Sequence, residues 1–232
     1  MTAREKRLGM CGDRRSKEHF DSEYEEPDPW HFFTSPYEQT KYQRQIELVK
    51  ELGVKPAKVL EIGCAEGAHT KMLAEAFPDS VVVAIDVSSR AIERARQNLA
   101  PYANVSLHGL DVMDFVGTTP DEEFDLIIWS EVIYYLADRL TPRDLLQFLE
   151  RLAAKLRNDG VLCMANIINQ PDADETPITR KPLMDCYYSL ICCLLEPVHR
   201  LSYFDHKPES GRTYLYEVWT FRRAFQDDER GK

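Results

Sequence analysis

The 232-residue sequence predicts an α/β protein whose single sheet has seven strands, is mostly parallel and ends in an antiparallel hairpin. The first observation is that five short apolar runs, rich in β-branched residues, alternate with stretches of helical character. The second is that these runs are apolar on both faces, which is typical of parallel strands covered by helices on two sides. The third is a pair of later strand-like runs with the break KPESG at 207–211 between them, which indicates a hairpin.

The N-terminal part is predicted to be a tail followed by a helical cap. Residues 1–16 are basic, polar and aperiodic, which indicates a flexible tail, and residues 17–56 form the cap segment. One helix is predicted to start after Ser35 as its N-cap, with Pro36 in the first position and Glu38 placed for a capping box. The helix is expected to run to about residue 52, before a glycine and a proline that end it.

The rest of the chain, residues 57–224, is predicted to be one domain. Its expected parallel strands are 58–63, 80–86, 104–111, 124–130 and 160–167, and the helices between them are 68–77, 89–100 and 141–157. A polar loop over 169–181, a helix over 182–195 and hairpin strands over 199–205 and 212–223 should follow. Residues 225–232 are predicted to be a disordered tail.

The composition restricts the partners and the location of the protein. The formal net charge of −10 and the pI near 5.2 argue against binding to nucleic acid or to anionic membranes. No apolar run approaches the roughly 18–20 residues of a membrane span, and the charged N-terminus has no signal-peptide centre, so a cytoplasmic location is expected. The six cysteines form no CxxC pair, which favours buried free thiols, and nothing requires a metal.

The strongest local motif follows the first predicted strand. The segment Glu61-Ile62-Gly63-Cys64-Ala65-Glu66-Gly67 takes a strand directly into a glycine-containing turn and then a helix. Glycines at such a turn let the backbone bend sharply and approach a ligand closely, and Ala65 stands where a third glycine often occurs. The turn therefore predicts a ligand site at the carboxyl end of the strand.

Two acids follow the next two strands. Asp86 ends the second strand, 23 residues after Gly63, where a carboxylate can accept hydrogen bonds from both hydroxyls of an adenosine ribose. Asp111 follows the third strand and is placed to accept the exocyclic amine of adenine. Mere turn and helix-cap roles are the alternative, but three such sites at successive strand ends favour a nucleoside-type ligand.

This order of motifs resembles the class I S-adenosylmethionine-dependent methyltransferases, over roughly residues 58–168. The resemblance implies a Rossmann-like methyltransferase domain, S-adenosylmethionine as the cofactor and S-adenosylhomocysteine as its product. The alternative cofactor is NAD, whose G-x-G-x-x-G/A motif fails at Ala65 but is met at Ala68. Glu61 and the terminal hairpin favour the methyltransferase.

Two segments are similar to the NodS-type N-methyltransferases, which methylate an amino-sugar nitrogen. The small-molecule methyltransferases of natural-product pathways have similar segments. These segments are Ser130-Glu131-Val132-Ile133-Tyr134-Tyr135-Leu136 and the stretch that contains Asp28-Pro29-Trp30 and Tyr37-Glu38. The resemblance implies that Trp30 and Tyr37 cover the cofactor and that Lys41 pairs with its carboxylate. The whole implied cofactor site is Trp30, Tyr37, Lys41, Glu61, Gly63, Cys64, Ala65, Gly67, Asp86, Val87, Asp111, Val112, Ser130 and Glu131.

The catalytic candidates are Glu131 and Tyr134. Glu131 can hold an acceptor amine, although a helix-start carboxylate is the alternative role. Tyr134 and Tyr135 diverge by about 100° on a helix, so one is expected to face the pocket and the other to join the core. No residue is marked as a strong base, which suits an amine better than an unactivated hydroxyl.

The sequence thus predicts methyl transfer to a small-molecule amine, amino-sugar-like or from specialised metabolism. An O-methyltransferase and a non-catalytic binding or regulatory subunit remain the alternatives. The expected partner is a small molecule rather than nucleic acid or a membrane, and the oligomeric state is left open.

Overall fold

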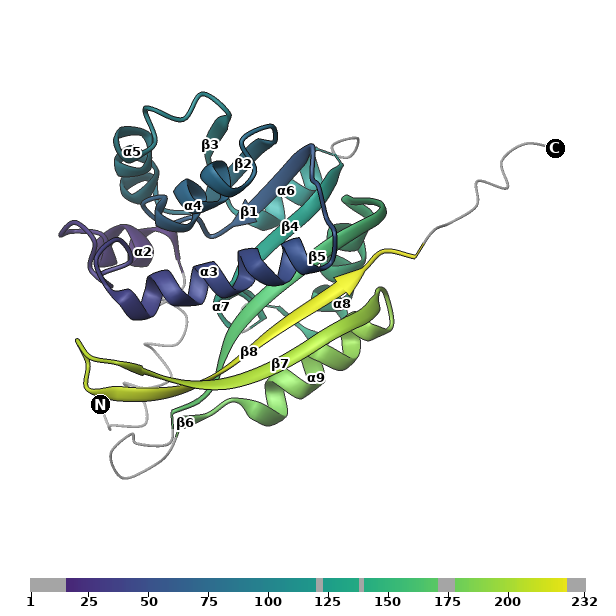
Figure 1. The fold of residues 1–232 in the computed structure, drawn as a ribbon. Helices are drawn as coiled ribbons and strands as arrows, with labels where there is room; N and C mark the ends of the chain where they lie inside the picture. The colour runs from purple at the N-terminus through teal and green to yellow at the C-terminus, as the bar shows by residue number, and fades with distance from the viewer. Residues whose placement is uncertain (1–15, 120–122, 138–139, 171–177, 225–232) are drawn as a thin grey trace.

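Figure 1 shows the computed structural model, which describes residues 16–119, 123–137, 140–170 and 178–224, as a twisted sheet with helices on both faces. The strands are β1 (Lys58–Ile62), β2 (Val81–Asp86), β3 (Val105–Gly109), β4 (Phe124–Ser130), β5 (Leu156–Gln170), β6 (Ile178–Thr179), β7 (Glu196–Lys207) and β8 (Arg212–Arg222). The helices are α2 (Lys17–Glu23), α3 (Pro36–Glu51), α4 (Ala68–Ala76), α5 (Ser89–Asn98), α6 (Val112–Thr118), α7 (Ile133–Ala137), α8 (Pro142–Ala154) and α9 (Lys181–Cys192).

The strand order indicates that a ligand site lies at the carboxyl ends of the central strands. The seven main strands lie in the order β3-β2-β1-β4-β5-β8-β7, and the two-residue β6 pairs with β5. The strands β1 to β5 are parallel, whereas β8 runs antiparallel to both β5 and β7. The predicted seven-stranded sheet with its terminal hairpin is therefore confirmed. Strand order reverses between β1 and β4, and ligands of open α/β sheets bind at the carboxyl ends of the strands at such a point.

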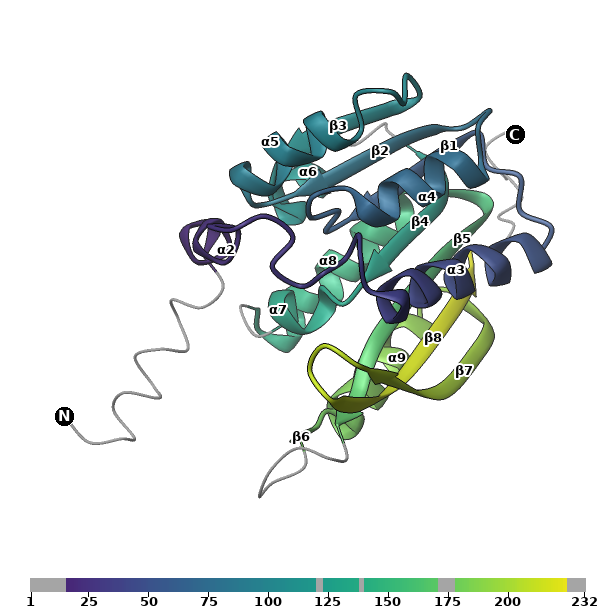
Figure 2. The same cartoon turned by 60° about the vertical axis from the view of Figure 1, so that its left-hand side comes forward.

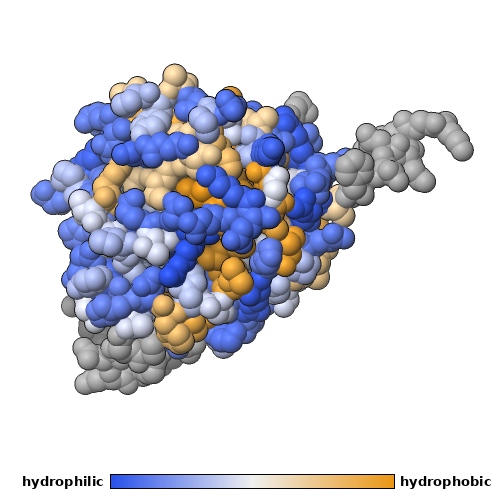
Figure 3. Space-filling view, viewed as in Figure 1, coloured by the Kyte–Doolittle hydropathy of each residue, from blue (hydrophilic) through white to orange (hydrophobic). Residues whose placement is uncertain are grey.

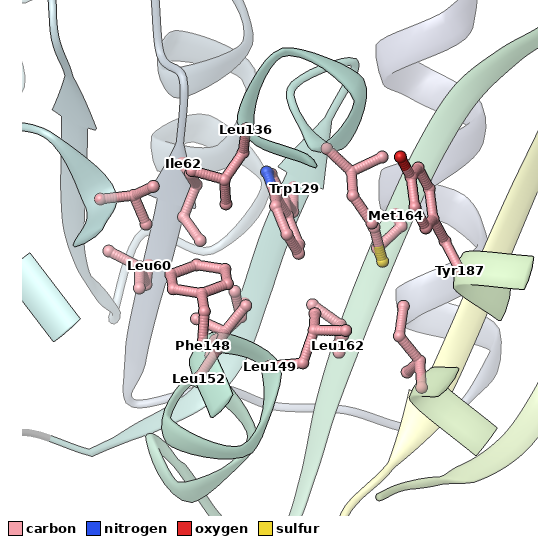
Figure 4. Packing of buried hydrophobic residues seen from close by; sticks show 14 of the residues in the cluster. Leu60, Ile62, Trp129, Leu136, Phe148, Leu149, Leu152, Leu162, Met164 and Tyr187 are labelled. Carbon is pink, nitrogen blue, oxygen red and sulfur yellow. The ribbon is translucent and has the colours of Figure 1, made fainter. Parts of the chain in front are cut away.

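Alternating side chains of the central strands fill two separate cores. Leu60, Trp129 and Met164 face one side, where Figure 4 shows them together with residues of α8 such as Phe148 and Leu149. Their sequence neighbours Val59, Ile128 and Cys163 face the other side and pack with apolar residues of α3 and α4. Because side chains of a strand alternate between faces, this apolar-on-both-faces pattern requires helices on both sides.

Helix α3 lies across the second face, with polar residues of its middle and last turns directed outward. Gln43, Glu47 and Lys50 are exposed, whereas Ile46 and Val49 are buried. In Figure 3, seen as in Figure 1, this face is largely hydrophilic, with apolar residues showing between polar side chains. Ser35 is the N-cap residue and Pro36 the first residue, as predicted, but Ser35 makes no side-chain cap hydrogen bond. The predicted capping box is wrong, because Glu38 turns away to pair with Lys41.

The segment before α3 contacts α5. Figure 2 shows α2, which belongs to this segment, beside α5. The Ser88 hydroxyl donates to the Asp21 carboxylate at 2.7 Å, and the Arg94 guanidinium lies 2.7 Å from the Glu66 carboxylate. Glu66 also accepts the backbone N–H of Asp28 at 2.8 Å. The buried Glu66 carboxylate thus joins the cap segment and α5 to the glycine turn, and Asp21 joins the cap segment to the start of α5.

Several predicted boundaries differ from the structure. Helix α8 ends at Ala154 rather than near residue 157, because the Lys155 carbonyl already accepts the Phe124 N–H at 2.8 Å and begins the pairing of β5 with β4. Helix α9 begins and ends slightly earlier than predicted, and β5 and β6 enter the expected loop, of which residues 171–177 lie outside the described part. The predicted tails also lie outside it, except for Ser16, which is the N-cap of α2.

Five cysteines lie in the described part of the chain, and none is in a disulfide there. Cys64 and Cys163 are buried, as predicted, whereas Cys186 and Cys193 are exposed on or just after α9. The expectation of buried thiols is therefore wrong for this pair, because the apolar face of α9 is formed by Met184, Tyr187 and Ile191 instead.

Candidate active site

A cavity of about 350 Å³ lies where the carboxyl ends of the parallel strands meet the N-terminal cap. Its size is within the range of small-molecule sites. The sequence-predicted residues that line it are Trp30, Tyr37, Lys41, Glu61, Gly63, Cys64, Ala65, Asp86, Val87, Asp111, Val112, Ser130, Glu131 and Tyr134. The structure therefore brings all of the predicted site residues except Gly67 to one cavity.

The glycine turn has left-handed backbone at three positions. Gly63 has φ +79°, and a Cβ there would collide with Val132, which itself lines the cavity. Ala65 has φ +51°, a region that residues with a side chain seldom adopt. Its N–H donates to Asp86 Oδ2 at 2.9 Å, so the strained residue is held by the acid at the end of β2.

Gly67 serves packing rather than the cavity. It is the N-cap of α4 with φ +92°, and a Cβ there would lie 2.6 Å from Leu99 Cδ1 and 3.5 Å from Ala95. Gly67 thus lets α4 and the end of α5 approach each other closely. Its predicted place among the residues that contact the cofactor has no support in this geometry.

Asp86 and Asp111 end neighbouring strands and face the same cavity. Asp86 accepts the N–H groups of Ala65 and Ser88, which leaves acceptor capacity on both carboxylate oxygens. Burial raises the pKa of Asp86 above its ordinary value, against the backbone hydrogen bonds that lower it. Asp111 is the N-cap of α6 and accepts the Met113 N–H at 2.9 Å.

Glu61 lies under the turn in a dry environment. It accepts a hydrogen bond from the Thr70 hydroxyl at 2.5 Å, and its Oε1 is 3.4 Å from His69 Nδ1 without hydrogen-bond geometry. Burial raises the pKa of Glu61 to about 7 and lowers the pKa of His69 to about 3. His69 is therefore a neutral ring, stacked on Tyr42 with 4.4 Å between the centroids.

Lys41 is buried between two carboxylates. Its ammonium group donates to Glu131 Oε1 at 2.7 Å and pairs with Glu38, and it lies 5.0 Å from the centre of the Tyr42 ring. Burial lowers the pKa of Lys41, but the neighbouring negative charges outweigh it and the net shift is upward. Lys41 is thus charged, and its ammonium group forms ion pairs with both Glu38 and Glu131.

Glu131 follows β4 with a strained backbone. Its φ of +59° is unusual for a residue with a long side chain, and its N–H donates to the Ala165 carbonyl of β5 at 2.8 Å. Burial raises the pKa of Glu131, while Lys41 lowers it. The preceding residue, Ser130, donates from its hydroxyl to Gln45 of α3 at 2.9 Å. Backbone strain of this kind clusters at functional sites.

Both tyrosines after Glu131 line the cavity. Tyr134 is buried, and the Arg180 guanidinium lies 4.3 Å from the centre of its ring. Burial raises the pKa of Tyr134 well above its ordinary value, so its hydroxyl stays protonated. Tyr135 is 41% exposed and contacts Phe20 edge to face. Tyr134 belongs to the buried apolar core on one side of the sheet, so the expectation that one of the pair joins the core is confirmed, although the same residue also lines the cavity.

Aromatic residues of the cap cover the cavity. Trp30 stacks on Phe32 with a centroid distance of 5.6 Å and contacts Tyr24 edge to face. Tyr37 lies 5.9 Å and 6.0 Å, between ring centroids, from Tyr214 and Tyr216 of β8.

Several cavity residues were not predicted from the sequence. The ones with aromatic or charged side chains are Phe20, Tyr24, Phe32, Glu38, Tyr42, His69, Tyr135, Arg180, Lys207, Tyr214 and Tyr216. Tyr214 and Tyr216 carry a usable signal, because residues two apart on a strand face the same side. Arg180 and Lys207 have no such signal, since only the folded arrangement of the chain brings them to the cavity.

No group of three or more potential ligands for a metal ion occurs among the residues that the structure describes. Within the same residues, none of the helices is both long and apolar enough to span a membrane.

Comparison with known proteins places residues 13–170 on the family model of nodulation protein S, NodS. Nodulation protein S of Bradyrhizobium diazoefficiens is 40% identical over 111 residues, which cover 48% of this chain and 50% of that protein. The match thus spans about half the length of this relative. A tRNA1(Val) (adenine(37)-N6)-methyltransferase of Vibrio campbellii is 30% identical over 189 residues, covering 74% of this chain and 77% of that enzyme.

The fold is shared with a solved member of the same group. The crystal structure of the N-methyltransferase NodS from Bradyrhizobium japonicum WM9, in complex with S-adenosyl-L-homocysteine, superposes with a TM-score of 0.69 at 24% identity. The superposition covers 90% of this chain and 98% of that one. At this identity the likeness establishes the Rossmann-like methyltransferase fold.

Proposed function

Because the chain belongs to the NodS family, we propose that it transfers a methyl group from S-adenosylmethionine to an amine of a small molecule. The acceptor proposed is an amino-sugar-like compound or a specialised metabolite. The family match supports the class of reaction, and the side chains that line the cavity support an amine as the acceptor group.

The observation that carries the proposal is the convergence of three strand ends on one cavity. The glycine turn after β1, Asp86 at the end of β2 and Asp111 after β3 all line it. Asp86 keeps free acceptor capacity beside the N–H donors of Ala65 and Ser88, as ribose hydroxyls require. These acceptors therefore fit an adenosine group, held by Asp86 and Asp111 and covered by Trp30.

The rest of the cavity fits the reacting end of the two substrates. When bound, S-adenosylmethionine supplies a methyl group on a sulfonium, which is already activated for displacement. The task of the chain is then to align the acceptor and to remove a proton from it. Glu131 is placed to hold an ammonium group, and burial makes its carboxylate a better proton acceptor than an exposed glutamate.

Tyr134 takes a different part in this proposal. Because its pKa is raised well above the ordinary value, its hydroxyl can orient the acceptor by hydrogen bonding but cannot take the proton as a phenolate. Lys41, bound to both Glu38 and Glu131, is better placed to hold Glu131 than to pair with the carboxylate of the cofactor. Methylation of a hydroxyl would need a stronger base than these groups provide.

Calorimetry with S-adenosylhomocysteine tests the cofactor site. We expect Asp86→Ala to weaken binding by about 10-fold or more, since hydrogen bonds to a charged group are lost. Asp79→Ala removes an equal charge from an exposed position before β2 and should bind as the wild type does. Equal affinities in all three proteins, or no binding by the wild type, would refute the proposed site. Thermal melts and the Asp86→Asn variant separate loss of the turn from loss of the ligand contacts.

A further inference from the structure

Four side chains of alternating charge form a continuous chain at one end of the cavity. Lys207 donates to Glu38 Oε1 at 2.6 Å, Glu38 pairs with Lys41, and Lys41 donates to Glu131 Oε1 at 2.7 Å. Glu38 and Lys41 belong to α3, Glu131 follows β4, and Lys207 ends β7. The chain of charges therefore links the cap helix, the parallel strands and the terminal hairpin.

The two inner members are almost without solvent. The exposed side-chain fraction is 3% for Lys41 and 4% for Glu38, against 13% for Lys207 and 23% for Glu131. A buried charge left without a partner is strongly destabilised. Each inner member has a partner of opposite sign on both sides. Removing the charge of Lys207 therefore changes the electrostatic interactions of Glu38 and Lys41, and through them those of Glu131.

We infer that Lys207 and Glu38 are positioning residues that act on Glu131 through Lys41. Lys207 neutralises Glu38, which leaves the ammonium group of Lys41 to hold Glu131 charged and directed toward the cavity. The inference rests on the proposed function, because that function gives Glu131 its role with the acceptor amine. Lys207 lies beyond residue 170, where the match to the family model ends, so this part of the site comes from a segment outside that match.

The charges around Glu131 set the direction of the expected effects. Burial raises the pKa of Glu131 most, Lys41 lowers it, Glu38 raises it, and Lys207 lowers it. The phenols of Tyr37, Tyr42 and Tyr134 also interact with the charge of Glu131, and the phenol of Tyr216 accepts from Lys41; all four are buried. Removing Lys207 should therefore make Glu131 harder to ionise, and removing Glu38 should make it easier.

The test is a titration of the Glu131 carboxyl carbon by NMR, in the full chain labelled with ¹³C-glutamate. The signal is assigned by its absence in Glu131→Gln. We expect Lys207→Met to move the midpoint up and Glu38→Gln to move it down, each by about 0.5 to 1 pH unit. The double variant should lie between the two single variants. Lys207→Arg keeps the charge and Lys50→Met removes one from an exposed site on α3, so both should titrate as the wild type does.

The opposite directions distinguish this role from a structural one. Loss of packing alone would move both midpoints the same way or leave them unchanged, and either result overturns the inference. If Lys207→Met does not fold in a thermal melt, Lys207→Gln replaces it. Because the titration needs no turnover, absence of methyl transfer in the wild type would refute the proposed function while leaving this coupling measurable.

Discussion

At the scale of single residues, backbone conformation and packing explain a glycine that the sequence motif attributes to ligand binding. Gly67 was predicted to contact the cofactor because it ends the glycine motif, yet it packs against Leu99 outside the cavity. Ala65 does line the cavity in a left-handed conformation that favours glycine. A motif thus identifies the turn, whereas the role of each residue depends on neighbours from distant parts of the chain.

We predict that Gly67→Ala lowers the free energy of unfolding by about 2–4 kcal/mol, the sum of a left-handed alanine and a collision with Leu99. Gly53→Ala is the matched control, because Gly53 also has positive φ, +71°, but no atom within 4 Å of the added Cβ. It should cost only about 1–2 kcal/mol. Chemical denaturation measures both, and equal losses would show that the contact with Leu99 does not constrain this turn.

The second prediction at this scale concerns Glu61, whose pKa is raised from 4.5 to about 7 by burial. Between these pH values the folded chain retains a proton that the unfolded chain releases, so this group lowers stability as pH rises. The isosteric variant Glu61→Gln should match the wild type near pH 4 and exceed its unfolding free energy by about 3 kcal/mol at pH 8.

His69 acts in the opposite sense, because its folded pKa of about 3 makes stability rise with pH up to the ordinary value of 6.5. Its contribution is common to both proteins and cancels in the difference between them. Urea denaturation at several pH values gives that difference, and a value independent of pH would contradict the burial of a titrating Glu61.

At the scale of elements, prediction succeeds where the pattern is repeated and fails where it is short. The strands were predicted because their apolar residues face two cores, and this property is visible in the sequence itself. Helices α2, α6 and α7 have seven, seven and five residues, too few for a helical period to show. They form because caps and tertiary contacts hold them, such as Asp111 at the start of α6.

The attachment of α2 gives a prediction for the cap. Arg94 of α5 contacts the Glu66 carboxylate and donates to the carbonyls of Glu25 and Glu26. Arg94→Leu should free the segment that brings Tyr24 and Trp30 to the cavity. We expect the Kd for S-adenosylhomocysteine to rise several-fold and cleavage before residue 35 by a protease to become faster.

Arg96→Leu is the control for this variant, since Arg96 is an exposed arginine of the same helix. Equal cleavage rates and equal affinities in the two variants would show that the Arg94 contacts do not hold the cap over the cavity.

At the scale of the whole molecule, the strand ends are the part of the site that the residue pattern alone predicts, whereas Trp30, Tyr37 and Lys41 of the cap were implied by the family resemblance. Asp86 and Asp111 could be predicted because parallel strands place their carboxyl ends at one edge of the sheet. Lys207 and Arg180 could not, because their approach to the cavity depends on where the end of β7 and the start of α9 lie in the folded chain. These residues follow the part of the chain that matches the family model, and they line the same cavity as the strand ends.

The net charge of −10 bears on the same question of the acceptor. The likeness to a tRNA methyltransferase covers 74% of the chain, so RNA belongs among the compounds to be tested. Phosphate backbones are bound by clustered positive charge, whereas Lys41 and Lys207 both pair with the buried Glu38 carboxylate. We therefore expect a neutral or cationic small molecule to be the better acceptor.

The most direct test is transfer of labelled methyl from S-adenosylmethionine to matched acceptors: an amino sugar, its N-acetyl counterpart, a phenol and a tRNA transcript. We expect label on the free amine alone, and a fall of about 100-fold in kcat for Glu131→Gln with little change in S-adenosylhomocysteine affinity. Label found only on a hydroxyl or on RNA, or no transfer to any acceptor by protein that binds S-adenosylhomocysteine, would contradict it.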